Sequence, residues 1–127
     1  MERLLGDVAL RAARYLDHLG SRAVVPAAAA ALARLGGLDG PLPEAPCNAA
    51  EIVRLLDEMG APATVASAGP RYFGFFTGGS LPAALAANWL AGAWDQNAFS
   101  VASSPLAATL ETRAIAWLLD VFGLSGE

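Results

Sequence analysis

Five stretches of the chain carry the residue spacing of helices, and no stretch carries a comparably good strand pattern. Over residues 4–19 the larger apolar side chains fall on one helical stripe, and Gly20 follows as the expected end of that helix. The other four predicted helices span residues 26–35, with Pro26 at the start, 48–59, 81–93 and 105–122, the last ending before Gly123. The pattern predicts a mainly α-helical chain.

Capping residues mark several of the predicted helix starts. Asn48 and Glu51 have the spacing of a capping box, in which each side chain bonds the backbone N–H of the other residue. Ser80 is the expected cap of the fourth helix, and Ser104, which precedes a proline, is the expected cap of the fifth. Residues 36–46 contain three Gly and three Pro and predict a linker between two helical parts.

Composition excludes several classes of function. The chain has 127 residues, with eight Arg, no Lys, twelve acidic residues and a net charge of −4, so it lacks the clustered cations that nucleic-acid binding requires. A chain without lysine cannot form a Schiff base through its own side chains or supply the lysine of a phosphate-binding loop. The apolar stretches 23–33 and 81–94 are too short to span a membrane. We therefore expect no nucleic-acid partner and no membrane segment.

Residue types that often carry catalysis are scarce. Cys47 is the single cysteine, so it forms no internal disulfide and is expected to be inert. Together with the lack of a signal-peptide pattern over residues 1–20, it predicts a cytoplasmic protein. His18 is the single histidine and is expected at a helix end without a chemical role. No group of residues has metal-ligand spacing, and no catalytic constellation is complete.

Aromatic side chains are concentrated in the second half of the chain. Nine of the ten aromatic residues follow position 70, and four of them lie within the five residues from Tyr72 to Phe76. A short β-like run of this kind cannot bury all four rings in one small helical core. Either some rings face a ligand or partner, or the segment is a connection that covers the core.

Two polar turns flank the fourth predicted helix. Residues 77–80 form a Thr-Gly-Gly-Ser turn before it, where glycines let backbone N–H groups approach an anion near the positive end of the helix dipole. The turn is a candidate seat for a carboxylate, with plain turn chemistry as the alternative. Asp95, Gln96 and Asn97 follow the helix, and a structural turn is the expected role for all three.

Several short motifs occur in order between residues 68 and 124. They are the stretch 69–82, Ala83-Ala84-Leu85-Ala86-Ala87, Trp94-Asp95-Gln96-Asn97, Ser103-Ser104-Pro105, Glu111 and Trp117-Leu118-Leu119. Together they resemble the amino-terminal part of the group II pyridoxal-phosphate-dependent amino-acid decarboxylases, the family of aromatic-L-amino-acid and glutamate decarboxylases. Residues 1–66 resemble that family only in their layout of helices and linker.

This resemblance implies an N-terminal fragment of a fold-type-I α/β enzyme (aspartate aminotransferase-like) several hundred residues long. Its cofactor, pyridoxal 5'-phosphate, would be held by a lysine further along the chain. Residues 1–80 would form a helical dimerisation segment that ends in a substrate loop, and residues 81–127 would form the first helices of the large domain. The implied activity is the release of carbon dioxide from an L-amino acid by a cytoplasmic homodimer with intertwined N-terminal helices. This chain alone would be inactive.

The resemblance also implies six substrate-binding residues: Phe75, Phe76, Thr77, Gly78, Asn97 and Phe99. Thr77 would lie near the substrate carboxylate, and Phe99 would line the pocket of the neighbouring subunit. No catalytic, cofactor-binding or metal-binding residue is expected within this chain. The alternative hypothesis is a stand-alone helical module that dimerises without catalysis. The identity of the amino-acid substrate does not follow from these residues.

Overall fold

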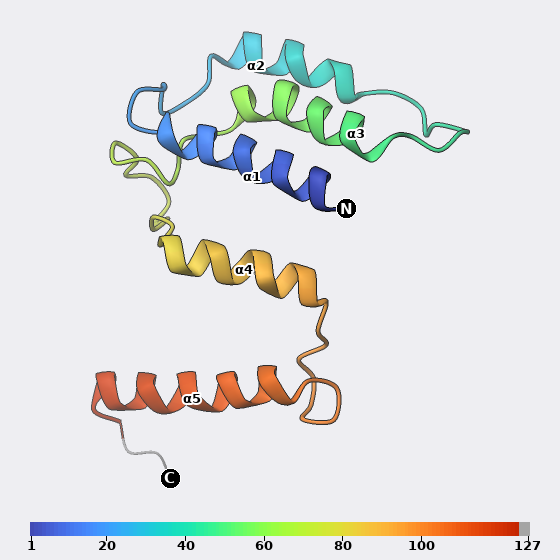
Figure 1. Cartoon of the computed structure of the whole chain (residues 1–127). Coiled ribbons are helices and arrows are strands. Elements are labelled where there is room, and N and C mark those ends of the chain that lie inside the picture. The colour runs from blue at the N-terminus through green and yellow to red at the C-terminus, as the bar shows by residue number, and fades with distance from the viewer. Residues whose placement is uncertain (125–127) are drawn as a thin grey trace. The chain divides into compact units, whose positions relative to one another are not determined.

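A computed structural model describes residues 1–124, with the side chains of all of them except Ala28 and Leu32. Its regular elements within that range are helices, and no strand occurs there (Figure 1), which confirms the predicted mainly α-helical class. The chain divides into two compact units, Met1–Gly79 and Ser80–Glu127. The functional roles expected for residues 1–80 and 81–127 stay predictions.

The first unit contains three α-helices and three short helical turns. They are α1 (Glu2–Asp17), α2 (Ala28–Leu35), η1 (Gly36–Leu38), α3 (Ala49–Leu55), η2 (Leu56–Gly60) and η3 (Ala61–Ala63). Helix α1 packs against α3, and α2 packs against η2 and η3, so the three α-helices lie side by side (Figure 1). Among the residues whose side chains are described, the buried apolar ones are Leu19, Ala31 and Ala66, and all three belong to this unit. The core is therefore small and is built mostly from small side chains.

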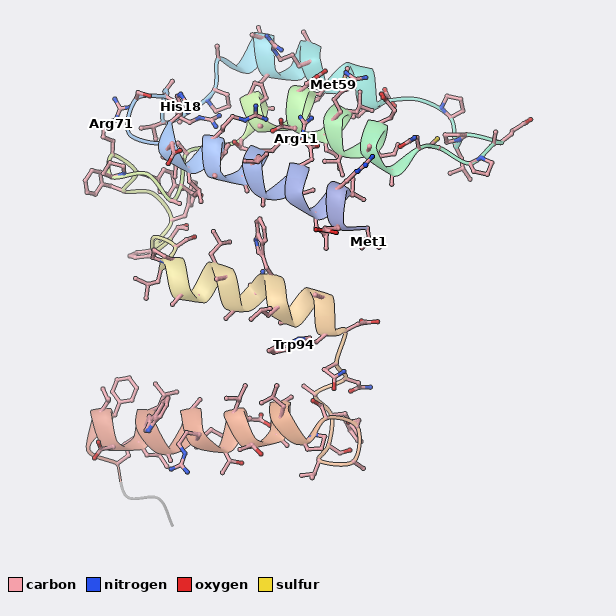
Figure 2. All side chains as sticks on the ribbon, in the orientation of Figure 1. Met1, Arg11, His18, Met59, Arg71 and Trp94 are labelled. Carbon is pink, nitrogen blue, oxygen red and sulfur yellow. The ribbon has the colours of Figure 1, made fainter. Side chains whose placement is uncertain are left out.

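A charged contact also links α1 to η2. The Arg11 guanidinium (Figure 2) lies 2.7 Å from a carboxylate oxygen of Asp7 and 2.7 Å from one of Asp57. The hydrogen bonds that Arg11 donates to Asp7 and Asp57 raise the pKa of Arg11, and the bond to Asp7 has the larger effect. Asp7 precedes Arg11 by one helical turn, so their ion pair lies within α1. Asp57 is distant in sequence, so its ion pair with Arg11 is a tertiary contact.

The ends of α1 and α2 differ from the sequence expectation. Helix α1 ends at Asp17 instead of Leu19, because the chain turns tightly there and the N–H of Leu19 bonds the Leu16 carbonyl at 3.1 Å. His18 caps this end, with Nδ1 2.7 Å from the carbonyl oxygen of Arg14, which confirms its expected helix-end position. Helix α2 begins two residues after Pro26. Its first backbone hydrogen bonds include the one from Ala31 N–H to the Ala27 carbonyl.

The predicted capping box at α3 forms only in part. The Asn48 side chain accepts a hydrogen bond from the Ala50 N–H at 2.9 Å, as expected of a cap. The Glu51 carboxylate instead binds Arg54, at 3.0 Å, because a charged partner three residues later on the helix competes with the neutral backbone N–H. The apolar stripe of this segment continues past Leu55, through the π-helical turn η2.

The second unit contains the helices α4 (Pro82–Trp94) and α5 (Pro105–Phe122). The prediction that Ser80 caps α4 is wrong. The N-cap residue is Leu81, and no side chain forms a capping hydrogen bond. The residue before a proline is held extended, and Leu81 (φ −77°, ψ 137°) is the last extended residue before Pro82, so Ser80 lies outside capping range.

Helix α5 begins and ends as its sequence predicts. The Ser104 hydroxyl accepts a hydrogen bond from the Ala107 N–H at 3.3 Å, and Ser104 is fully buried. Gly123 ends the helix in the left-handed conformation, at φ 63°. No residue within α4 or α5 is buried, although both helices are rich in large apolar side chains. Of the helices in the described part of the chain, none is both long and apolar enough to cross a membrane.

Candidate functional site

The aromatic segment of the first unit, residues 72–79, is an exposed loop and not the β-like run expected from sequence. Phe73, Phe75 and Phe76 are 93%, 92% and 108% exposed, whereas Tyr72 is partly covered. The expectation that this small core cannot bury all four rings is therefore confirmed. We call residues 72–79 the aromatic loop.

The backbone of the aromatic loop is strained at its centre. Phe75 and Phe76 both have left-handed backbone conformations, with φ of 54° and 53°. Bulky residues rarely adopt this region, and each such residue costs about 1–3 kcal/mol. The turn is closed by a hydrogen bond of 3.2 Å from the Thr77 N–H to the Gly74 carbonyl. Two consecutive left-handed residues reverse the chain and replace the alternating geometry of a strand.

Glycines shape both sides of this turn. A Cβ atom on Gly74 would lie 2.9 Å from the Tyr72 hydroxyl oxygen, so the absence of a side chain lets the Tyr72 ring pack over Gly74. A Cβ atom on Gly78 or Gly79 would meet nothing within 4 Å. The backbone beside Thr77 is therefore open to approach by a small ligand. Four of the six predicted site residues, Phe75 to Gly78, share this one exposed loop.

The other two predicted site residues lie in the second unit, in the turn that follows α4. Asp95 caps α4 in a left-handed conformation (φ 48°), and the Gln96 side-chain amide donates to the Trp94 carbonyl at 2.9 Å. The Asn97 side-chain oxygen accepts a hydrogen bond from the Phe99 N–H at 2.9 Å. These bonds confirm the expected structural turn. Phe99 is 91% exposed, so the turn presents its ring outward.

A serine cluster that was not predicted from the sequence, Ser100, Ser103 and Ser104, continues this turn into α5. The N–H of Ser104 donates to the Ser100 carbonyl at 2.9 Å, and the Ser103 hydroxyl donates to the same carbonyl at 2.9 Å. The sequence signal was present, because Ser100 precedes the predicted cap by four residues and serines commonly bond nearby backbone groups. The cluster fixes the path of the chain from Phe99 to α5.

The residues of this chain do not fit the covalent attachment of pyridoxal phosphate. That attachment requires a lysine amine, and the 127 residues contain no lysine. Within residues 1–124 no group of three or more His, Cys, Asp or Glu side chains is placed to hold a metal ion. The aromatic loop exposes three phenylalanine rings, the Thr77 side chain and the open backbone at Gly78 and Gly79.

Comparison with known proteins identifies the family. A family model described as the pyridoxal-dependent decarboxylase conserved domain matches residues 35–127, which is well over half of the chain. The chain therefore belongs to the pyridoxal-dependent decarboxylase family, whose cofactor is pyridoxal phosphate, and the resemblance seen in its motifs is confirmed. The match includes all six predicted site residues. No curated protein and no solved structure gave a significant match.

Proposed function

We propose that the protein is a carboxy-lyase that releases carbon dioxide from an L-amino acid, and that this chain supplies substrate-binding residues. The observation that carries the proposal is the aromatic loop: three phenylalanines more than 90% exposed, on a strained turn, inside the region that matches the decarboxylase family. Strained backbone conformations are concentrated at ligand-binding sites. An exposed apolar group of this size beside a polar turn is typical of a binding surface.

Each residue of the loop has a distinct proposed role. The N–H of Thr77 is engaged in the turn, so the Thr77 hydroxyl is the group that we propose donates to the substrate carboxylate. Gly78 keeps the adjacent backbone open, which lets the carboxylate approach the N–H groups. Phe75 and Phe76 supply apolar walls that exclude water from the bound amino acid.

Phe99 and Asn97 form the second part of the proposed site. The hydrogen bond from the Phe99 N–H to Asn97 holds the turn so that the ring projects outward. We place this ring in the substrate pocket of a second subunit. The protein would then be a homodimer whose N-terminal helices intertwine, and its pockets would be completed across the subunit interface.

The exposed apolar side chains support an assembly of this kind. Large apolar residues on both units are open, including Leu10 on α1, at 67%, and Val121 on α5, at 76%. Surfaces this apolar normally pack against other protein. We place the protein in the cytoplasm on the basis of its single, unpaired cysteine. The whole enzyme would take its cofactor lysine from residues other than these 127, and this chain alone would be inactive.

The competing hypothesis is a helical module that dimerises without catalysis. It explains the exposed helix faces equally well. It does not explain why a region with an exposed, strained aromatic loop matches the decarboxylase family, so the family match favours the enzyme.

Substitution of Thr77 by Val in the full-length protein tests the proposal. The change keeps the shape of the side chain and removes the hydrogen bond, so substrate binding should weaken by about 1–3 kcal/mol. Turnover should fall as well, because a loosely held carboxylate adopts the reactive orientation less often. The pyridoxal phosphate content should not change.

Thr112→Val is the matched control for this experiment. The Thr112 hydroxyl donates to the Ala108 carbonyl at 3.0 Å within α5, so its loss removes a hydroxyl without touching the loop. Kinetics with a panel of L-amino acids should show a raised KM in Thr77→Val only. A Thr77→Val enzyme that releases its cofactor and keeps its KM would show that the turn serves the cofactor or the fold.

A further inference from the structure

The Arg22 side chain forms hydrogen bonds between two segments of the first unit that are about forty residues apart in sequence. The Nη2 nitrogen of Arg22 donates to the carbonyl oxygens of Ala61, at 2.8 Å, and of Thr64, at 3.3 Å. The guanidinium carbon lies 4.7 Å from the centroid of the Tyr15 ring, in cation–π contact. The end of α1 is thereby joined to η3 and to Thr64, the residue that follows it. Hydrogen bonds from a charged donor are stronger than neutral ones, so Arg22 is well suited to hold this junction.

Neighbouring contacts strengthen the same junction. The Tyr15 hydroxyl lies 2.8 Å from the Thr64 hydroxyl, and the Ala66 N–H donates to the Val24 carbonyl at 2.9 Å. Ala66 is only 2% exposed. A Cβ atom on Gly69 would lie 3.3 Å from the Leu19 carbonyl oxygen, so the two segments of backbone approach closely at this point. The junction is one of the few well-packed places in the unit.

Arg71 extends the junction to the base of the aromatic loop. Its Nη2 donates to the carbonyl oxygen of Arg22. Figure 2 shows Arg71 beside the end of α1 that carries His18. The next residue, Tyr72, is the first of the loop, and its N–H donates to the Gly69 carbonyl at 3.2 Å. We call Tyr15, Arg22, Thr64 and Arg71 the arginine clamp.

The loop itself has little else to hold it. Phe73, Phe75 and Phe76 are each more than 90% exposed, so their rings are not anchored in the core of the unit. The internal bond from Thr77 to Gly74 fixes the shape of the turn and not its position. The orientation of the loop relative to α1 is therefore set where the chain enters it, at the arginine clamp.

We propose that Arg22 is a positioning residue for substrate binding: its side chain holds the backbone at residues 61–64, and Arg71 ties the start of the aromatic loop to the Arg22 carbonyl, so that together they hold the loop in place. This inference rests on the proposed function, because it takes the loop as part of the substrate pocket. Arg22 lies outside residues 35–127, which match the family, whereas the loop lies inside. A segment outside the matched region thus controls the placement of a site within it.

The test compares four arginine variants in the full-length protein. Arg22→Ala removes the hydrogen bonds to the Ala61 and Thr64 carbonyls and the contact with the Tyr15 ring, and it keeps the backbone carbonyl that Arg71 bonds. Arg22→Lys keeps the charge but loses the planar stacking on Tyr15. Arg71→Ala removes one hydrogen bond at an exposed position, so it leaves the fold intact. Arg54→Ala is the matched control, since Arg54 pairs with Glu51 and Glu58 on the surface of the same unit, at 3.0 and 2.6 Å.

Hydrogen exchange measures whether the clamp holds the loop, and enzyme kinetics measure whether the loop binds substrate. Hydrogen exchange in residues 72–79 should be about tenfold faster in Arg22→Ala than in Arg54→Ala, with smaller increases in Arg22→Lys and Arg71→Ala. The KM for the amino acid should rise in the same order, with kcat changed less and the cofactor content unchanged.

The outcomes distinguish the two ideas. If hydrogen exchange in residues 72–79 is as slow in Arg22→Ala as in Arg54→Ala, Arg22 does not hold the loop, and this result is independent of the enzyme's KM. Faster exchange with an unchanged KM shows that the clamp holds a loop that does not bind substrate, which overturns the positioning role and the substrate site together. Faster exchange in Arg22→Ala, with a KM that rises across the variants in the same order as the exchange rate, supports the positioning role of Arg22 and the substrate site in the loop.

Discussion

The two units of the chain bury their side chains to different extents. In Met1–Gly79 three α-helices pack together, an ion pair joins α1 to η2, and the buried residues Leu19, Ala31 and Ala66 form a small core. In the described part of Ser80–Glu127 no apolar side chain is buried. The helices of the second unit are well defined by local signals such as Ser104 and Gly123, but they have not buried their apolar faces. Local sequence signals therefore specify helices in the second unit, whereas the buried apolar side chains of the described residues all lie in the first.

The largest expected effect comes from separating the units. A polypeptide of residues 1–79 should keep most of its helical circular dichroism and unfold with a sigmoidal thermal transition. A polypeptide of residues 80–127 should lose most of its helicity or self-associate, because isolated helices without a buried face are marginal in water. Circular dichroism and sedimentation measure both. A monomeric 80–127 peptide with a sharp melting transition would contradict the comparison.

Overpacking the core of the first unit should have the next largest effect. Ala66 is 2% exposed, so Ala66→Leu should lower the free energy of unfolding by about 1–3 kcal/mol. Ala114, on the exposed surface of α5, is the control, and Ala114→Leu should change stability by less than about 0.5 kcal/mol. Urea denaturation of the full-length protein measures both variants. Equal effects at the two positions would remove the distinction between a packed and an unpacked unit.

Loss of the buried cap of α5 should cost somewhat less. Ser104→Ala removes the acceptor of the Ala107 N–H and should destabilise the protein by about 1 kcal/mol. Ser80→Ala is the matched control, because Ser80 precedes α4 but makes no capping bond, and it should be neutral. A thermal shift for Ser80→Ala as large as that for Ser104→Ala would show that Ser80 does cap α4.

The smallest expected effect is a gain in stability at the end of α4. Asp95 holds a left-handed conformation at φ 48°, which glycine adopts without steric cost, so Asp95→Gly should stabilise by up to about 1 kcal/mol. Asp120→Gly, within α5, should instead destabilise by about 1 kcal/mol. Thermal denaturation distinguishes them by sign. The same sign for both variants would argue against the left-handed cap.

The sequence predicted those features that depend on neighbouring residues. The Asn48 cap, the Ser104 start and the Gly123 end each need only the few residues around them, and each is confirmed. The cap at Ser80 failed because Pro82 moved the helix boundary by one residue, a competition between two local rules. The π-helical turn η2 has no sequence signal, because its apolar positions also satisfy the α-helical pattern.

The candidate site shows the same division between local and distant effects. The exposure of Phe73, Phe75 and Phe76 was predictable, since a small core has no room for several rings. The left-handed turn was not, because phenylalanine has no preference for that conformation. The contact of Arg22 with Ala61 was also beyond prediction, since no spacing rule connects residues so far apart in sequence.

The most direct test of the central proposal uses carboxyl-labelled L-amino acids. The full-length protein, supplied with pyridoxal phosphate, should release the label as carbon dioxide from at least one amino acid, and Thr77→Val should raise the KM for that release while Thr112→Val does not. Retention of the label in every product, or release that is indifferent to Thr77→Val, would contradict the assignment of the aromatic loop to a decarboxylase substrate site.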